Sequence, residues 1–329
     1  MYKKMRGLAA ALLTCAMAAS AAAQTDGAAQ GFPAHPVKLI VAAATGSSPD
    51  AISRRLANDL GIKWKQPVVV ENAVGLGGII GTEKAAKQAP DGYTLLISTI
   101  GAMSVGGSLM KLPYDPVKDF QPVTLAMSMP NLLVVHPSVP AKTLDELIAY
   151  GKRNPNKLRY GHPGIGTTPH LSAELLMEMT GLKMQPIPYK SSAQMATDLL
   201  AGHYEVLFHN SSVMLPHVQS GAARPLAVTG ADRVGTLPDI PTVAEAAGLK
   251  GFAVNAWWGI YVPAGTPPDI VARLNGDITA ALDQPDTRKW VEDQGGTVGG
   301  GTQEDLRAHQ AAETRRWSEL IKKAGIKPD

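Results

Sequence analysis

The feature that most constrains this chain is a repeated alternation of short apolar strands and helices. Strands are expected at residues 37–43, 67–72 and 91–99, with helical patterns after the first two. The alternation resumes after Pro140 and continues to about residue 230. Strands that alternate with helices through short loops form parallel sheets covered by helices. The sequence therefore predicts an α/β protein.

Two such α/β units are expected, because 329 residues suffice for two domains of ordinary size. The long aromatic segment 252–265 has the character of a strand that crosses between them. It is followed by an amphipathic helix over 267–282 and a last helix over about 303–323. The C-terminal part of the chain thus returns to one of the two units.

The first 23 residues have the pattern of a secretory signal. Three basic residues precede an apolar run, and three alanines precede Gln24. We expect cleavage near Ala23/Gln24 and an exported mature protein, since no later stretch approaches the roughly 20 apolar residues of a transmembrane helix. Cys15, the only cysteine, lies in this segment. Its lipidation is an alternative, although Thr14 stands where a lipoprotein signal has a smaller residue.

The charge balance argues against a nucleic-acid partner. The whole chain is formally +3, and the signal segment carries three basic residues and no acidic one. The mature chain is therefore nearly neutral, without a basic block. It also has no thiol for a disulfide or a thiolate metal site.

Glycine-rich stretches follow three of the expected strands: ATGSSPD, NAVGLGGIIG and YGHPGIGTTPH. In open α/β sheets the ligand lies outside the carboxyl ends of the strands. A phosphate loop does not fit, because the third stretch runs G-x-x-G-x-G and no P-loop lysine follows. A helix N-terminus that holds another anion and a simple capped turn both remain open.

The chain resembles the Bug receptors, the TctC-type periplasmic solute-binding proteins of tripartite tricarboxylate transporters. The resemblance covers essentially the whole mature chain and is carried by these stretches: PVKLIVAAATGSSPDAISRRLA, PVVVENAVGLGGIIGTEKAAKQAPDGYTLLI, KLPYDPVKDFQPVTL, YGHPGIGTTPHLSAELL, DLLAGHYEVLFHN, LPDIPTVAEAAG and WWGIYVPAGTPPDIVARLN. It implies a two-domain Venus-flytrap fold with parallel-rich sheets and flanking helices. Domain 1 would take residues 31–128 and 256–329, and domain 2 residues 129–255.

The resemblance also implies a function. Such a protein captures a small organic anion between its domains and delivers it to membrane subunits of the transporter, without catalysis or a cofactor. A monomer in the periplasm is expected, and a same-fold receptor that signals to a membrane sensor is the alternative. The residues implied in ligand binding are Thr45, Gly46, Ser47, Ser48, Asp50, Gly77, Gly78, Ile79, Met103, Gly166, Thr167, Thr168, His170, His209, Asn210 and Trp257.

The third glycine loop is expected to hold a carboxylate. We expect Thr168 to be the N-cap of a helix with Pro169 at the first helical position. The amides of His170 and Leu171 would then be free, and the helix macrodipole would attract an anion. Capping alone is the alternative role for Thr167 and Thr168.

Departures from the family pattern indicate the ligand class. Thr45, Ile79 and Met103 stand where the family pattern has other residues, mostly polar ones, and His209 stands where it has an aspartate. A cleft that has lost a carboxylate serves an ammonium poorly. We therefore expect an aromatic carboxylate or a short aliphatic mono- or dicarboxylate rather than aspartate or glutamate. Trp257 is expected either to stack on an aromatic ligand or to pack at the hinge.

A serine hydrolase is the alternative from a different class. Residues 102–106, AMSVG, resemble a nucleophile elbow centred on Ser104. Ser104 stands several residues beyond the expected strand end at Ser98, which does not suit an elbow. The eight histidines show no metal-binding spacing such as H-x-x-x-H.

Overall fold

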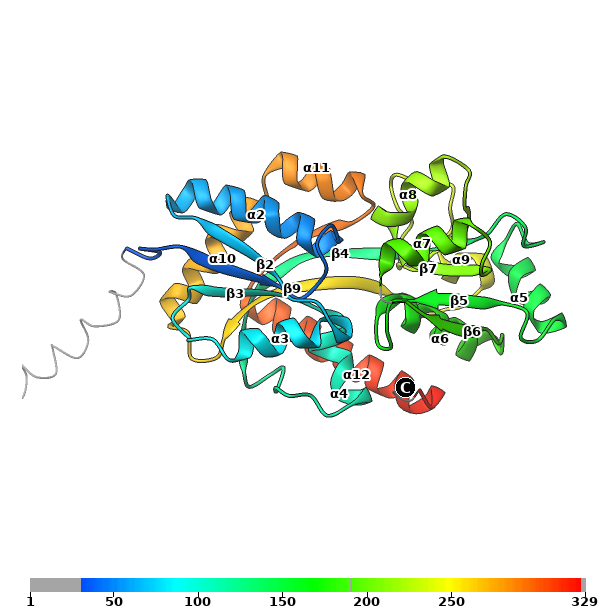
Figure 1. The fold of residues 1–329 in the computed structure, drawn as a ribbon, viewed down its shortest axis with the longest axis horizontal. Helices are drawn as coiled ribbons and strands as arrows, with labels where there is room; N and C mark the ends of the chain where they lie inside the picture. Colours follow the sequence, from blue (N-terminus) through cyan, green and yellow to red (C-terminus); the bar gives the residue numbers. More distant parts are fainter. Residues whose placement is uncertain (1–30, 190, 327–329) are drawn as a thin grey trace, which may run out of the picture.

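The computed structural model describes residues 31–189 and 191–326. The predicted signal segment, with Cys15 and the expected cleavage point near Ala23/Gln24, lies outside these residues. The described chain forms two lobes joined by two long strands (Figure 1). Within the described ranges, no helix is both long and apolar enough to cross a membrane.

The first lobe contains the three parallel strands that the sequence predicted, in the order β2-β1-β3. β9 and β4 extend this sheet in antiparallel orientation, and β10 pairs with β4. The strands are β1 (Val37–Val41), β2 (Val68–Asn72), β3 (Thr94–Thr99), β4 (Phe120–Val135), β9 (Asn255–Pro263) and β10 (Thr297–Gly300). The helical segments are α2 (Ser48–Trp64), η1 (Leu76–Gly78), α3 (Ile79–Ala86), η2 (Gly101–Val105), α4 (Gly106–Leu109), α10 (Pro268–Leu282), α11 (Pro285–Asp293) and α12 (Gln303–Ala324).

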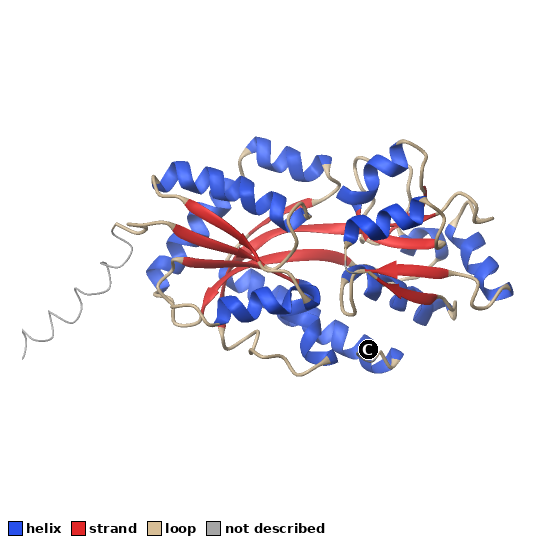
Figure 2. Ribbon diagram, in the orientation of Figure 1, coloured by secondary structure: helices blue, strands red, loops and turns tan. Residues whose placement is uncertain are grey.

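The second lobe repeats the parallel arrangement around the far half of β4. β6 and β7 flank β5 in parallel, while β7 and β8 pair with β4 in antiparallel orientation. Its remaining strands are β5 (Arg159–His162), β6 (Gln185–Pro188), β7 (Val206–Asn210) and β8 (Arg224–Val228). Its helices are α5 (Leu144–Arg153), α6 (Thr168–Thr180), α7 (Ser192–Leu200), α8 (Ser211–Gln219) and α9 (Val243–Ala247). Helices cover both faces of the sheet in each lobe (Figure 2).

Two long strands, β4 and β9, cross between the lobes. β9 was expected from its aromatic sequence, but the 16-residue β4 was not. It contains Pro122 and Pro130, and proline cannot donate a hydrogen bond to a neighbouring strand. A register shift beside Pro122 accommodates the first proline in the pairing with β9. The carboxyl ends of β1, β2 and β5 point toward the line where the lobes meet (Figure 1).

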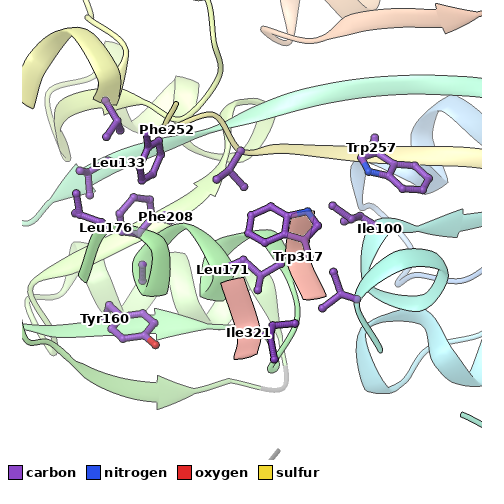
Figure 3. Packing of buried hydrophobic residues seen from close by; sticks show 14 of the residues in the cluster. Ile100, Leu133, Tyr160, Leu171, Leu176, Phe208, Phe252, Trp257, Trp317 and Ile321 are labelled. Atoms are coloured by element: carbon purple, nitrogen blue, oxygen red, sulfur yellow. The ribbon is translucent and has the colours of Figure 1, made fainter. Parts of the chain in front are cut away.

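One hydrophobic cluster runs through both lobes. It includes Ile100 and Trp257 of the first lobe, Leu171 of α6, and Trp317 and Ile321 of α12. Figure 3 shows Trp317 beside Leu171, with Ile321 on the same side. The C-terminal helix therefore packs against both lobes.

Candidate functional site

Two loops of the same sequence pattern, one from each lobe, lie where the lobes meet. GSSPD (46–50) joins β1 to α2, and GTTPH (166–170) joins β5 to α6. In both, the glycine has a φ of 78°, a left-handed conformation that glycine adopts without steric strain. Each helix also has a proline within its first two positions. The N-termini of α2 and α6 are therefore alike, and both lie where the lobes meet.

The hydrogen bonds of the two loops also match. The Ser47 hydroxyl donates to the Ala44 carbonyl, and the Thr167 hydroxyl to the Gly164 carbonyl, both at 2.6 Å. Ser47 and Thr167 are the N-caps, yet neither side chain accepts a hydrogen bond from its helix. The first-turn amides are therefore left without a side-chain cap, an arrangement that favours a bound anion.

The expected cap position was wrong by one residue. The N-cap of α6 is Thr167, and Thr168 is the first helical residue, with Pro169 following it. The Leu171 amide is not free, because it donates to the Thr167 carbonyl at 2.9 Å. The N-terminal amides of α6 that remain for a ligand are those of Thr168 and His170.

The two N-termini differ in charge at their third helical residue, which is Asp50 in α2. The residue is 2% exposed, and its carboxylate accepts hydrogen bonds from the Gly46 amide at 2.8 Å and the Asn72 amide group at 2.9 Å. Arg54 pairs with it at 3.0 Å. Burial alone would raise the pKa of Asp50, but hydrogen bonds from Arg54, Gly46 and Asn72 hold it below its usual value. The α2 N-terminus therefore carries an anion of its own.

The equivalent residue of α6, His170, contributes no charge. Its buried ring lies 3.8 Å (Nε2 to Oε1) from Glu174 and 5.1 Å from the His162 ring. Burial, and to a smaller extent His162, lower the pKa of His170 to about 3, so the ring is neutral at pH 7. Its Nδ1 has no hydrogen-bond partner among the described residues. The His170 ring packs inside the second lobe, among Glu174 and His162, whereas its backbone amide lies at the N-terminus of α6.

Direct contacts bring the predicted loops together. The Ser48 hydroxyl of α2 lies 2.9 Å from the Ser212 hydroxyl of α8. A Cβ atom built on Gly77 would lie 3.6 Å from the Thr167 methyl group. The Thr45 hydroxyl donates to Asn72 at 3.2 Å. Ser48 of the first lobe thus contacts the second lobe, and Gly77 lies beside Thr167.

Three predicted residues lie deeper in the fold. Ile79 and Met103 are 6% and 1% exposed and belong to the shared hydrophobic cluster. Trp257 is 1% exposed and packs edge-on against the His309 ring at 5.0 Å. This contact favours the hinge-packing interpretation of Trp257, and its stacking on a ligand stays a prediction.

His209 is the most unusual of the predicted residues. It lies one position before the end of β7, is 5% exposed, and has no partner for either ring nitrogen within the described chain. Burial lowers the pKa of His209 to about 4, so the ring is neutral at pH 7. Buried polar atoms are normally hydrogen-bonded to protein or water. Asn210, the next residue, is the N-cap of α8.

Sequence reasoning missed several residues that shape the loops. The Thr99 hydroxyl donates to the Gly77 carbonyl at 2.6 Å and fixes the turn before α3. Arg54 and Asn72 hold Asp50, and Ser212 reaches across from α8. Of these residues, only Arg54 could have been identified from the sequence, because it stands four residues after Asp50, a spacing at which helical side chains meet.

The geometry at Ser104 differs from a nucleophile elbow. Ser104 lies in a π-helical turn, η2, and its hydroxyl donates to the Gln310 carbonyl of α12 at 3.2 Å. An elbow would place the serine on a sharp turn directly between strand and helix. Among the described residues, no group of three acidic, histidine or cysteine side chains is arranged to hold a metal ion.

The chain is similar to known receptors over most of its length. The model of the tripartite tricarboxylate transporter family receptor, TctC, matches residues 52–326. Several solved structures are similar, among them Rpa4515, BugD and MatC. Rpa4515 of R. palustris, solved with adipate, is 37% identical, with 91% of this chain and 100% of that chain covered and a TM-score of 0.85. The periplasmic binding protein BugD is 34% identical, with 91% and 100% covered and a TM-score of 0.83.

The third structure is MatC from Rhodopseudomonas palustris, solved with bound malate. It is 31% identical, with 88% of this chain and 100% of that chain covered and a TM-score of 0.81. The two-lobed α/β fold agrees with these matches. The chain belongs to the TctC receptor family of periplasmic solute-binding proteins.

Proposed function

We propose that this protein captures a small carboxylate in the periplasm and delivers it to membrane subunits of a tripartite tricarboxylate-type transporter. The observation that carries the proposal is the α6 N-terminus. Its first turn has no side-chain cap, it lies at the line between the lobes, and its third residue, His170, is neutral. The adipate and malate found in similar proteins support a carboxylate as the ligand.

The ligand carboxylate would lie against the second glycine loop. The amides of Thr168 and His170 would donate to it, and the Thr168 hydroxyl would add a third donor. Gly166 gives this loop its shape, since its backbone adopts a φ that other residues avoid. Ser48 and Gly77 would close over the ligand from the first lobe.

We also propose the domain division that the family implies, residues 31–128 with 256–329 and residues 129–255. One feature modifies it at the C-terminus. Lys323 of α12 forms an ion pair with Glu178 of α6 at 2.6 Å, and Arg316 donates to the Ala253 carbonyl. The last turns of α12 would thus move with the second lobe, although α12 begins in the first.

The ligand is expected to lack an ammonium group. An ammonium needs a carboxylate or several acceptors when it is buried. The Asp50 carboxylate is already held by three partners, and His209 is neutral. Aromatic carboxylates and short aliphatic mono- or dicarboxylates suit these surroundings.

Calorimetric titration of the mature protein tests the proposal. The ligands are adipate, malate, succinate, benzoate, terephthalate, aspartate and glutamate. Binding of one or more acids without an ammonium group is expected. Tight binding of aspartate or glutamate alone would contradict the ligand class, and no heat with any ligand would contradict the function.

Export is the remaining part of the proposal. If residues 1–23 are a cleaved signal, the protein recovered from the periplasm begins at or near Gln24. Intact mass spectrometry measures this directly, and an additional lipid mass on Cys15 would identify the lipoprotein alternative. A full-length cytoplasmic product would contradict export.

A further inference from the structure

Helix α8 begins at the boundary between the lobes, and its first two residues both contact the first lobe. The Ser211 hydroxyl donates to the Gln294 carbonyl at 2.8 Å, with the Gly295 carbonyl oxygen at 3.3 Å. The Ser212 hydroxyl lies 2.9 Å from the hydroxyl of Ser48. One end of α8 is therefore joined to two elements of the first lobe, the turn between α11 and β10 and the start of α2.

The carbonyl groups that face Ser211 are ones that α11 does not use itself. Gln294 is the C-cap of α11, and carbonyls at the end of a helix have no partner within it. Ser211 is fully buried, so its hydroxyl and the Gln294 carbonyl satisfy each other away from water. Separation of the lobes would expose both groups to water, which replaces most of the hydrogen bond. The contact is therefore favourable but reversible.

The turn between α11 and β10 has a shape that permits this contact. Gly295 has a φ of 75°, which glycine adopts without steric strain. A Cβ atom built on it would lie 2.8 Å from a methyl carbon of Val234 and 2.9 Å from the Ser211 hydroxyl oxygen. Val234 and Ser211 both belong to the second lobe. The lack of a side chain at Gly295 thus lets the second lobe approach the turn.

The contact is local, because a cavity lies beside it. This cavity has a volume of about 430 Å³ and is lined by both lobes. Asp232 and Val234 contribute from the second lobe, and Glu292 and Gly296 from the first. The lobes therefore do not form a continuous apolar core on this side, and they can part here by breaking a few polar contacts.

We propose that Ser211 and Ser212 form a latch that holds the lobes together whether or not a ligand lies between them. Every atom of the latch belongs to the protein, so its strength does not depend on the ligand. Ser211 is then a positioning residue for ligand capture, because the apparent affinity rises with the fraction of molecules whose lobes are together. Only this effect on affinity rests on the proposed function.

Disulfide trapping tests the latch directly. The expected mature chain has no cysteine, so Ser48→Cys/Ser212→Cys introduces a single pair of thiols. The two hydroxyls they replace are 2.9 Å apart, close enough for a disulfide when the lobes are together. With a fixed concentration of oxidised glutathione, mass spectrometry should show the disulfide in the protein without ligand. Saturating adipate should raise its rate of formation by less than about threefold.

A third substitution in this background removes the main hydrogen bond of the latch. Ser211→Ala should slow disulfide formation without ligand by about three- to tenfold, as expected for one buried hydrogen bond. The matched control is Ser53→Ala, because Ser53 is also fully buried but donates to Pro49 within α2 at 2.6 Å. It should leave the rate unchanged. Circular dichroism and thermal unfolding verify that each variant folds.

Calorimetry with adipate measures the effect on binding. In Ser211→Ala, without the two cysteines, the dissociation constant should rise by about three- to tenfold, while Ser53→Ala should match the wild type. A dissociation constant that does not rise in folded Ser211→Ala would overturn the positioning role.

The outcomes separate the latch from the proposed function. A disulfide that forms only with adipate, or that does not form, would overturn the latch, and so would an unchanged rate in folded Ser211→Ala. If Ser211→Ala does not fold, the comparison with and without adipate decides alone. A protein that forms the disulfide as expected but binds none of the acids would support the latch and contradict the proposed function.

Discussion

At the residue scale, burial keeps two histidines of the second lobe neutral. The pKa of His209 is lowered to about 4 and that of His170 to about 3, in both cases first by desolvation. Both residues were predicted from the sequence, but their burial was not. A residue's position beside a glycine loop can be read from sequence, whereas the direction of its side chain depends on the packing of distant helices. The sequence analysis did not identify Glu174, which lies one turn after His170 and faces its ring.

The lowered pKa of His209 predicts a pH dependence of stability. In the unfolded chain the His209 ring binds a proton as the pH falls through about 6.5. In the folded chain it does so only near its lowered pKa of about 4. Stability from this group is therefore fully present above pH 6.5 and is lost as the pH falls through that window, by about 2 kcal/mol at pH 5. Urea unfolding at pH 7 and pH 5 measures it. His209→Gln should show a smaller loss than the wild type. Equal losses in the two proteins would contradict the prediction.

Two neighbouring threonines should separate structure from binding. Thr167→Val removes the hydroxyl that donates to Gly164 at 2.6 Å, and should cost about 1 kcal/mol of stability. Thr168→Val removes a proposed ligand donor, and should weaken adipate binding while thermal unfolding stays close to wild type. Calorimetry on the folded variants makes the comparison. Unchanged affinity in Thr168→Val would assign Thr168 a structural role alone.

At the scale of helices and strands, local sequence pattern predicted most of the elements. The helices over 267–282 and 303–323 are confirmed as α10 and α12, and strands with regular apolar residues are confirmed in both lobes. The long strand β4 was missed because Pro122 and Pro130 argue locally against a strand. Long-range pairing with β9 and β7 overrides that local preference. The N-cap of α6 was misplaced because Thr167 and Thr168 are equally good caps by type, and only the loop geometry distinguishes them.

The packing of α12 predicts a large effect of its central tryptophan. Trp317 is fully buried in the cluster that both lobes share, whereas Trp290 of α11 is only partly buried at the edge of the first-lobe core. Trp317→Ala should destabilise the protein by about 3–5 kcal/mol, because a large cavity replaces the ring. Chemical unfolding should show a clearly smaller loss for Trp290→Ala. Similar losses for the two variants would contradict the central role of Trp317.

At the scale of the whole molecule, several features connect the lobes. β4 and β9 cross between them, Ser211 and Ser212 of α8 contact the first lobe, and the end of α12 contacts the second. The sequence predicted the crossing segment at residues 252–265 but not β4, and the domain division implied by the resemblance placed α12 wholly in domain 1. Its contacts with the second lobe depend on tertiary packing, which an amphipathic pattern alone does not specify. α12 therefore ties the two lobes together on its side of the molecule.

Reversing one charge at the end of α12 should loosen this connection. Lys323→Glu places a carboxylate against Glu178, so the last turns of α12 should leave the second lobe more readily. Under the proposed function the ligand is held between the lobes, so separating them should raise the apparent dissociation constant for adipate, by about two- to fivefold for an exposed pair. Small-angle X-ray scattering without ligand should show a larger radius of gyration. The double variant Lys323→Glu/Glu178→Lys should restore both values. Arg307→Glu, which disrupts a pair within the first half of α12, is the control and should change neither. A radius and an affinity unchanged in Lys323→Glu would show that α12 does not hold the lobes together.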